Sequence, residues 1–239
     1  MKKTPPDLEE RLKFFIDIGA DFVIRTDGRI SASPGLANSG EPPFSPGEIP
    51  PPARDIAAIH AEILTCPKCR LSACRTHAVP GEGDPRAALM FVGEGPGRDE
   101  DVQGRPFVGR AGQLLTKIIS AMAYERSEVF ITNIVKCRPP ENRTPFGDEA
   151  EACTPYLVEQ IANIRPRAIV ALGKVATDYF VPGATGGMTS IRGQFYSWCG
   201  IPVMPTFHPS YLVRNEGNKT IKKMVWDDMK KVMDLLGKK

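Results

Sequence analysis

The chain has 239 residues, 41% of them hydrophobic, and a formal net charge of +3. This hydrophobic share suits one compact domain with or without an extension, and the slight basic excess neither requires nor excludes a polyanionic partner. No segment reaches the roughly 18 apolar residues of a transmembrane helix, and no apolar run follows the N-terminal lysines as it does in a secretory signal. We therefore expect a cytoplasmic protein that has no membrane partner.

Residues 1–52 differ in composition from the rest of the chain. Apolar residues at helical spacing predict a short amphipathic helix over residues 7–18. Residues 31–52 are rich in Pro, Gly and Ser, which is typical of a linker because such a segment buries too little apolar surface to offset its ordering entropy. We predict an N-terminal extension over 1–52, either a plain tail or a partner-binding helix on a linker, and a compact domain over 53–239.

The compact domain shows alternating strand and helix patterns. After a helix that ends at Cys66, the predicted strands span residues 87–92, 129–135, 168–172 and 203–207. The predicted helices span residues 111–122, 148–164, 174–180 and 219–236. This alternation indicates an α/β fold with a largely parallel sheet and helices on both faces. Ligands of such sheets bind beyond the carboxyl ends of the strands, so site residues are expected there.

A glycine-rich and acidic loop follows the first predicted strand. Residues 93–101 read GEGPGRDED, which matches neither a dinucleotide-binding motif nor a P-loop. A tight turn alone would explain the glycines. The four carboxylates, Glu94 and Glu100 among them, disfavour phosphate binding but suit polarising a water molecule or stabilising a developing cation.

Phe107 lies in a loop between Pro106 and a glycine two residues on, not on a periodic apolar face. A loop aromatic of this kind either closes the edge of the core or offers a stacking surface to a flat ligand such as a nucleobase. The segment by itself favours neither interpretation.

Asn133 interrupts the apolar run of the second predicted strand. A buried amide must satisfy both its donor and its acceptor, and most do so with a structural hydrogen bond to backbone. The alternative is that the amide pairs with a ligand edge that offers one donor and one acceptor, such as N3–H and O4 of uracil. Cytosine presents the opposite pattern and would be refused, because the mismatch leaves buried polar groups unpaired.

Four of the six cysteines form two pairs that predict a metal centre. Cys66 and Cys69 are a C-x2-C pair at a helix end, and Cys137 and Cys153 form a wider pair. Disulfides are not expected in a reducing cytoplasm. Zinc and an iron–sulfur cluster both fit four thiolates. The long separation between the pairs is unlike a compact zinc ribbon and favours a cluster, while the alternative is that some of the four are ordinary buried thiols.

A histidine marks the carboxyl end of the last predicted strand. His208 stands where a site residue is expected, and its ring could donate a hydrogen bond to negative charge on a leaving group. Tyr211 and Leu212 could form an apolar wedge that enters a DNA stack, with Arg214 on a phosphate. Ordinary loop packing is the alternative for these three residues.

In combination, these motifs resemble the family 4 uracil-DNA glycosylases, the iron–sulfur branch of the uracil-DNA glycosylase superfamily. The resemblance covers roughly residues 60–236. The matching segments stand in the family's order and read GEGPGRDED, GRPFVGRAG, TNIVKCRPPENRTP, ALGKVA, SIRG and FHPSYLVR.

The resemblance implies a fold, a cofactor and an activity. The expected fold is a three-layer α/β/α sandwich with a central four-stranded parallel sheet. The expected cofactor is a [4Fe–4S] cluster, held by Cys66, Cys69, Cys137 and Cys153. The expected activity is hydrolysis of the N-glycosidic bond of uracil in single- or double-stranded DNA, by a monomer that leaves an abasic site.

The resemblance also assigns roles to the site residues. Glu94 and Gly95 belong to the family's first motif, and Phe107 is expected to stack on uracil. Asn133 is expected to read the edge of the base, and His208 to lie on its O2 side. The acidic residue that the family carries at the position of Glu100 is also present, and we include it among the catalytic residues.

Two departures from related families refine these expectations. The branch that links itself covalently to DNA carries a histidine in an inserted basic segment, whereas residues 141–152 read ENRTPFGDEAEA and contain none, so free turnover is expected. The family 1 enzymes carry a tyrosine in their first motif that is missing here, so another group such as Glu94 must exclude the methyl group of thymine.

Two other functions compete with this interpretation. One is a non-catalytic iron–sulfur module that binds DNA within a replication or repair complex. The other is a metal-dependent nucleotide hydrolase that uses the acidic loop.

Overall fold

The computed structural model divides the chain into two units, residues 1–46 and 47–239. The residues that it describes are 22–24, 30–32, 51–52 and 54–238. In the first unit, strand β1 (Phe22–Ile24) pairs with β2 (Ile30–Ala32) in an antiparallel ribbon that the sequence did not predict. The helix predicted over 7–18 lies outside the described residues.

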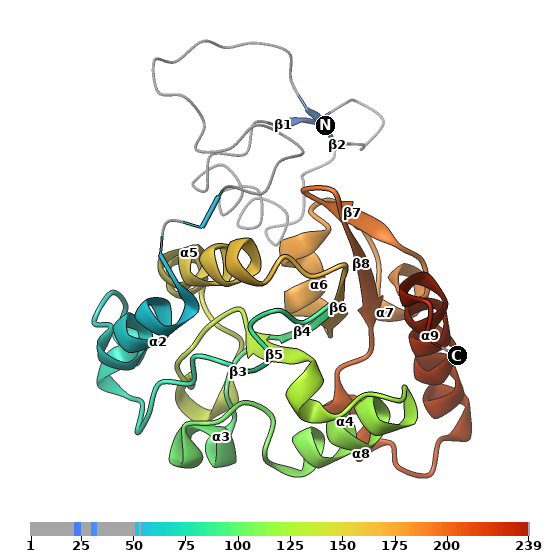
Figure 1. The fold of residues 1–239 in the computed structure, drawn as a ribbon, viewed down its shortest axis with the longest axis horizontal. Helices are drawn as coiled ribbons and strands as arrows, with labels where there is room; N and C mark the ends of the chain where they lie inside the picture. Colours follow the sequence, from blue (N-terminus) through green and yellow to red (C-terminus); the bar gives the residue numbers. More distant parts are fainter. Residues whose placement is uncertain (1–21, 25–29, 33–50, 53, 239) are drawn as a thin grey trace, which may run out of the picture. The chain divides into compact units, whose positions relative to one another are not determined.

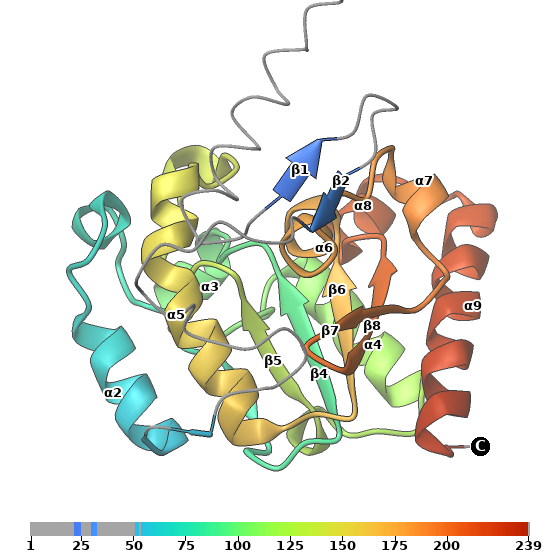
Figure 2. The same cartoon turned by 90° about the horizontal axis from the view of Figure 1, so that it is seen from above.

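The second unit contains one sheet with the strand order β3-β5-β4-β6-β8-β7. The strands are β3 (Glu82–Gly83), β4 (Leu89–Gly93), β5 (Phe130–Asn133), β6 (Ala168–Leu172), β7 (Tyr196–Trp198) and β8 (Ile201–Thr206). The four inner strands are parallel, which confirms the predicted sheet, and Figure 2 shows them side by side. The two short edge strands β3 and β7 are antiparallel additions that were not predicted.

Eight α-helices cover this sheet in the described part of the chain. They are α2 (Ile56–Thr65), α3 (Arg98–Gln103), α4 (Arg110–Ala121), α5 (Gly147–Ile164), α6 (Lys174–Phe180), α7 (Met188–Ile191), α8 (Pro209–Arg214) and α9 (Lys219–Leu236). Helices α5 and α6 lie on one side of the sheet, and α4 and α8 lie on the other (Figure 1). No described helix combines the length and the apolar character that crossing a bilayer requires.

The hydrophobic core explains why the inner strands are largely apolar. Every residue of β4, β5 and β6 is buried, as expected for parallel strands that are covered on both faces. On one face, Leu89, Phe91 and Val170 pack in a cluster with Leu115 of α4 and Met229 of α9. The core therefore holds the four strand ends in a fixed register, and the loops that follow them start from fixed points.

Candidate active site

A cavity of about 410 Å³ lies at the carboxyl ends of the parallel strands. Its wall is built by the segments that follow β4, β5 and β8. Among the residues that line it are seven that the sequence singled out: Glu94, Gly95, Glu100, Phe107, Asn133, His208 and Arg214. The structure therefore brings together residues that are more than 100 positions apart in the chain.

Asn133 presents an unpaired acceptor to this cavity. The residue is 1% exposed, and its Oδ1 atom is the one buried side-chain N or O atom of the described residues without a hydrogen-bond partner. An unpaired buried polar atom costs about 1–3 kcal/mol. This cost is removed when a ligand brings a donor, so the amide is prepared for a ligand.

Gly93 makes room for this arrangement. It stands opposite Asn133 in the parallel register of β4 and β5. A Cβ atom at position 93 would lie 2.5 Å from Oδ1 of Asn133 and 2.6 Å from the ring of Phe107. Because real Cβ atoms do not approach so closely, only glycine lets the amide and the ring lie together here.

Phe107 is held in an unusual backbone conformation. Its φ angle is +50°, in the left-handed region that few non-glycine residues adopt, and its side chain is almost fully buried. A Cβ atom at Gly112 would lie 1.9 Å from the carbonyl of Phe107, so the start of α4 packs directly on this backbone. The ring centroid lies 5.6 Å from that of His208. The ring is thus fixed beside the imidazole at the cavity wall.

Glu100 anchors the loop that carries Phe107. One carboxylate oxygen, Oε1, accepts hydrogen bonds of 2.9 Å from the backbone N–H groups of both Val108 and Gly109. Although Glu100 lines the cavity, its Oε1 atom is already used in these two bonds, which hold the loop at Val108 and Gly109 in place. The geometry therefore favours a positioning role for Glu100 over the catalytic role that the sequence suggested.

His208 is held as a neutral ring with a defined tautomer. The backbone N–H of Ser210 donates to Nδ1 of His208 over 3.1 Å, so Nδ1 must accept and the ring proton resides on Nε2. Burial, together with the positive charge of Arg214, lowers the pKa of His208 to about 4. Near pH 7 the ring is a neutral donor through Nε2.

Glu94 lies on the loop directly after β4. The backbone N–H of Val135 donates to the Glu94 carbonyl over 3.1 Å, which extends the pairing of the two strands into their loops. Burial raises the pKa of the Glu94 carboxyl, and a hydrogen bond with Thr144 acts in the opposite direction. A partly desolvated carboxylate of this kind is suited to binding a water molecule.

The structure separates the three residues predicted to contact DNA. Arg214 lines the cavity. Tyr211 is exposed and stacks on Phe207, with the ring centroids 5.1 Å apart. Leu212 is only 3% exposed and belongs to the hydrophobic core. In this conformation Leu212 packs in the core, so its position lends no support to its predicted use as a wedge.

The segment between β5 and α5, quoted above only as part of a matching motif, forms another wall of the cavity. Pro139, Asn142, Arg143 and Thr144 line it from the stretch between β5 and α5. Both guanidinium amino groups of Arg143 donate to the buried carboxylate of Glu149, over 2.8 and 2.6 Å. Two signals pointed to this stretch: it follows a strand that ends at the cavity, and it lies within the matching motif TNIVKCRPPENRTP.

The four predicted cysteine ligands surround one small second cavity. Cys66 ends α2, Cys69 follows it, Cys137 lies after β5, and Cys153 lies within α5. Within the described ranges, no group of three or more His, Cys, Asp or Glu residues is placed so that it could hold a metal ion as it stands. Four thiols around one space nevertheless match the ligand set that zinc and an iron–sulfur cluster share.

Donors to sulfur support this fit. A guanidinium N–H of Arg75 donates to Sγ of Cys137 over 3.0 Å, and the backbone N–H of Lys136 donates to Sγ of Cys153 over 3.3 Å. Burial raises the pKa of both thiols, and the charge of Arg75 beside Cys137 opposes that effect. Lys136 opposes it beside Cys153, but more weakly, because burial lowers the pKa of its own ammonium group to about 7. The surroundings therefore offer both hydrogen bonds and positive charge to ligating thiolates.

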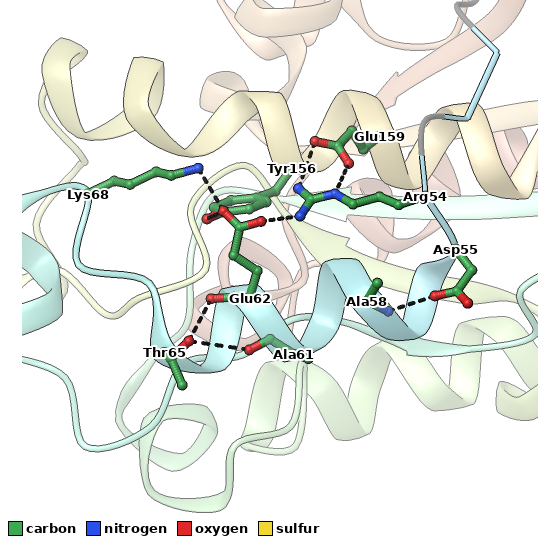
Figure 3. A network of polar contacts seen from close by, with 9 residues as sticks. All are labelled: Arg54, Asp55, Ala58, Ala61, Glu62, Thr65, Lys68, Tyr156 and Glu159. Atoms are coloured by element: carbon green, nitrogen blue, oxygen red, sulfur yellow. Dashed lines mark hydrogen bonds and ion pairs between the residues drawn. The ribbon is translucent and has the colours of Figure 1, made fainter.

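A polar network fixes the helix that carries Cys66 to the helix that carries Cys153 (Figure 3). The carboxylate of Glu62 in α2 accepts hydrogen bonds from Lys68 over 2.8 Å and from the hydroxyl of Tyr156 over 2.6 Å, and it also pairs with Arg54. Arg54 donates in turn to Glu159 of α5. The two helices thus hold their cysteines at a constant separation.

Comparison with known proteins agrees with this geometry. The family model of the uracil DNA glycosylase superfamily matches residues 80–230, more than half of the chain. All the residues named above for the first cavity lie within the match. The chain therefore belongs to the uracil DNA glycosylase superfamily.

Individual relatives narrow the assignment. The chain is 46% identical to the type-4 uracil-DNA glycosylase of Saccharolobus solfataricus, over 74% of this chain and 85% of the relative. It is 45% identical to the type-4 enzyme of Thermotoga maritima, over 75% and 94%. Identity to the type-5 uracil-DNA glycosylase of Pyrobaculum aerophilum is 36%, over 60% and 70%. The likeness thus places the chain in the type-4 branch.

Proposed function

We propose that the protein is a cytoplasmic, monomeric and monofunctional uracil-DNA glycosylase, with residues 53–239 as its glycosylase domain. It hydrolyses the N-glycosidic bond of uracil in single- or double-stranded DNA and leaves an abasic site. The observation that carries the proposal is the unpaired Oδ1 acceptor of Asn133, buried at one cavity with the Phe107 ring and the neutral His208 donor.

The cavity recognises an extruded uracil by its face and its edge. Flipping the nucleotide costs a few kcal/mol, which stacking on Phe107 and pairing with Asn133 offset. Oδ1 of Asn133 accepts from N3–H, and the amide nitrogen donates to O4. Cytosine offers an acceptor at N3 and a donor at C4, so both partners would be mismatched.

Bond cleavage is assisted at both ends of the breaking bond. As the N-glycosidic bond stretches, negative charge develops on uracil and positive charge on the sugar. His208 donates from Nε2 to O2 of the leaving base, and backbone amides near Gly95 stabilise the same anion. Glu94 orients the attacking water and offsets the charge on the sugar.

Cys66, Cys69, Cys137 and Cys153 would hold a [4Fe–4S] cluster. The cluster would supply a structural crosslink between the helix before Cys66 and the segments of Cys137 and Cys153. The residues around it support this use, because Arg75 and the Lys136 backbone already donate toward sulfur.

The test of the activity is an alkali-cleavage assay. The protein is incubated with an oligonucleotide that contains one uracil and then treated with alkali, which breaks the strand at an abasic site. We expect scission at the uracil position without added magnesium. Binding without scission would support the non-catalytic module instead, and dependence on magnesium would support the nucleotide hydrolase.

Gly93→Ala is expected to slow uracil release by about 10²-fold, because a displacement near 1 Å in an active site has an effect of this size. The new methyl group must push Asn133 or Phe107 out of position. Single-turnover rates of the alkali assay measure the effect. Gly187→Ala is the matched control, since a Cβ atom there meets nothing within 4 Å. Equal rates for the two variants would contradict the proposed packing.

Cys153→Ser is expected to remove most of the bound iron and the visible absorbance of the cluster. Cys199→Ser, which changes a cysteine outside the second cavity, should leave both unchanged. Metal analysis of the purified proteins checks the prediction. Zinc in place of iron in the unmodified protein would refute the cluster, since the filled d shell of zinc gives no visible band.

A further inference from the structure

A third cavity, of about 170 Å³, lies between α4, α8 and the start of α9. Three cationic side chains line it, Arg110 and Lys117 from α4 and Lys222 from α9. One carboxylate, that of Glu216, also borders it, so the charges around the hollow are predominantly positive.

No interaction within the described part of the protein explains why these three cationic side chains lie around one cavity. Within the ranges described above, none of them forms an ion pair or a side-chain hydrogen bond with another residue. Some other cations of the domain are neutralised by a carboxylate, as Arg143 is by Glu149 and Arg192 by Asp228. Like charges gathered around one hollow repel each other, and an anion bound among them would relieve the repulsion.

The position of this cavity connects it to the active site. Ala111 lines the first cavity, and its neighbour Arg110 lines the third. Helix α8 also contributes to both, because Arg214 faces the first cavity while Val213 faces the third. Helices α4 and α8 lie side by side (Figure 1). A strand that places one nucleotide in the first cavity would therefore run its backbone past the third.

We propose that the cavity lined by Arg110, Lys117 and Lys222 binds a backbone phosphate of the uracil-containing strand, next to the extruded nucleotide. The inference rests on the proposed function and extends it. A phosphodiester carries one negative charge and several acceptor oxygens, which suit an arginine fork and two ammonium groups. This subsite strengthens DNA binding and positions the strand along the protein. Cleavage of the N-glycosidic bond takes place in the first cavity.

The first test changes charge at the cavity and keeps side-chain length similar. Lys117→Gln and Lys222→Gln are each expected to raise KM for a uracil oligonucleotide about five-fold, with the single-turnover rate at saturation unchanged. The slope of log binding constant against log salt should fall by about one for each variant. Lys223→Gln is the matched control, because it removes the same charge from the adjacent position of α9 without touching the cavity.

The second test identifies the phosphate. Oligonucleotides are prepared with one phosphate at a time replaced by an uncharged methylphosphonate. At the contacted position, this replacement should weaken binding to the unmodified protein more than binding to Lys117→Gln, which has already lost one of the three cationic partners. If the losses of binding free energy from Lys117→Gln and from the methylphosphonate simply add at every phosphate position, the proposal is overturned.

The remaining outcomes separate the subsite from the activity. KM values of Lys117→Gln and Lys222→Gln equal to that of Lys223→Gln would refute the subsite and leave uracil release intact. Inorganic phosphate that binds the unmodified protein but neither variant, with unchanged KM for DNA, would make this a site for free phosphate and refute the backbone contact. If the protein binds DNA without releasing uracil, fluorescence anisotropy of the same variants still decides the subsite while the proposed function fails.

Discussion

His208→Ala is expected to slow uracil release by about 10²- to 10³-fold, the usual effect of removing one donor from a developing anion. The variant loses the Nε2–H donor that the Ser210 backbone contact fixes in place. Because the interaction forms fully only as charge develops on the base, the loss should appear in the single-turnover rate and much less in KM. His77→Ala is the control, as His77 is exposed and lies outside the cavity.

The pKa of His208 sets the pH dependence of this contribution. Its value of about 4 lies below the usual 6.5, so the folded protein resists protonation of the ring. Between these two values the unfolded chain binds the proton more readily, and the contribution of His208 to the free energy of unfolding decreases as pH falls through that window. The ring itself stays neutral down to pH 5, so the His208-dependent part of the rate should be flat from pH 7 to 5. A rate that rises as pH falls through 6.5 would show that the charged imidazole is the active form, contrary to the proposed role.

Asn133→Asp is expected to lower uracil release by about 10³- to 10⁴-fold and to reduce the preference for uracil over cytosine by at least as much. A carboxylate offers two acceptors, so one of them faces O4 of uracil without a proton between them. The same oxygen accepts the amino group of cytosine, and the carboxyl group in its protonated form would also donate to N3. Cytosine release by the variant should therefore increase as pH falls.

Paired oligonucleotides that contain uracil or cytosine at one position measure this exchange of preference. Asn218→Asp provides the control, because Asn218 caps α9 through its side-chain oxygen and aspartate is an equally good cap. An Asn133→Asp variant that retains the unmodified ratio of uracil to cytosine release would show that another group reads the edge of the base.

The long elements of the fold could be predicted closely from the sequence. Strand 168–172 and helix 219–236 have the predicted bounds, and the other inner strands and long helices begin or end within three residues of them. The short elements α3, α7, α8, β3 and β7 of the second unit were missed, because two to six residues do not display a period. Strand β5 ends at Asn133, two residues before the predicted end at Val135. Ile134 and Val135 belong to the following loop, where their backbone N–H groups donate to the carbonyls of Gly93 and Glu94.

The site could be predicted in part. Residues that follow parallel strands must meet at one edge of a sheet, so the gathering of Phe107, Asn133 and His208 at one cavity was foreseeable. The lack of a hydrogen-bond partner for Oδ1 of Asn133 could not be predicted, since it depends on the space that Gly93 leaves beside this atom. The burial of Leu212 was also unforeseen, because six residues of α8 are too few to reveal which side faces the core.

The stretch from Cys137 to Cys153 begins and ends at proposed cluster ligands, and its middle forms a wall of the cavity. A bound cluster would therefore anchor both ends of this wall. Chelation or oxidation of the iron should make the segment from Cys137 to Cys153 more mobile under conditions in which the sheet is still folded. In a titration with chelator, catalysis would then fade while circular dichroism still reports intact secondary structure.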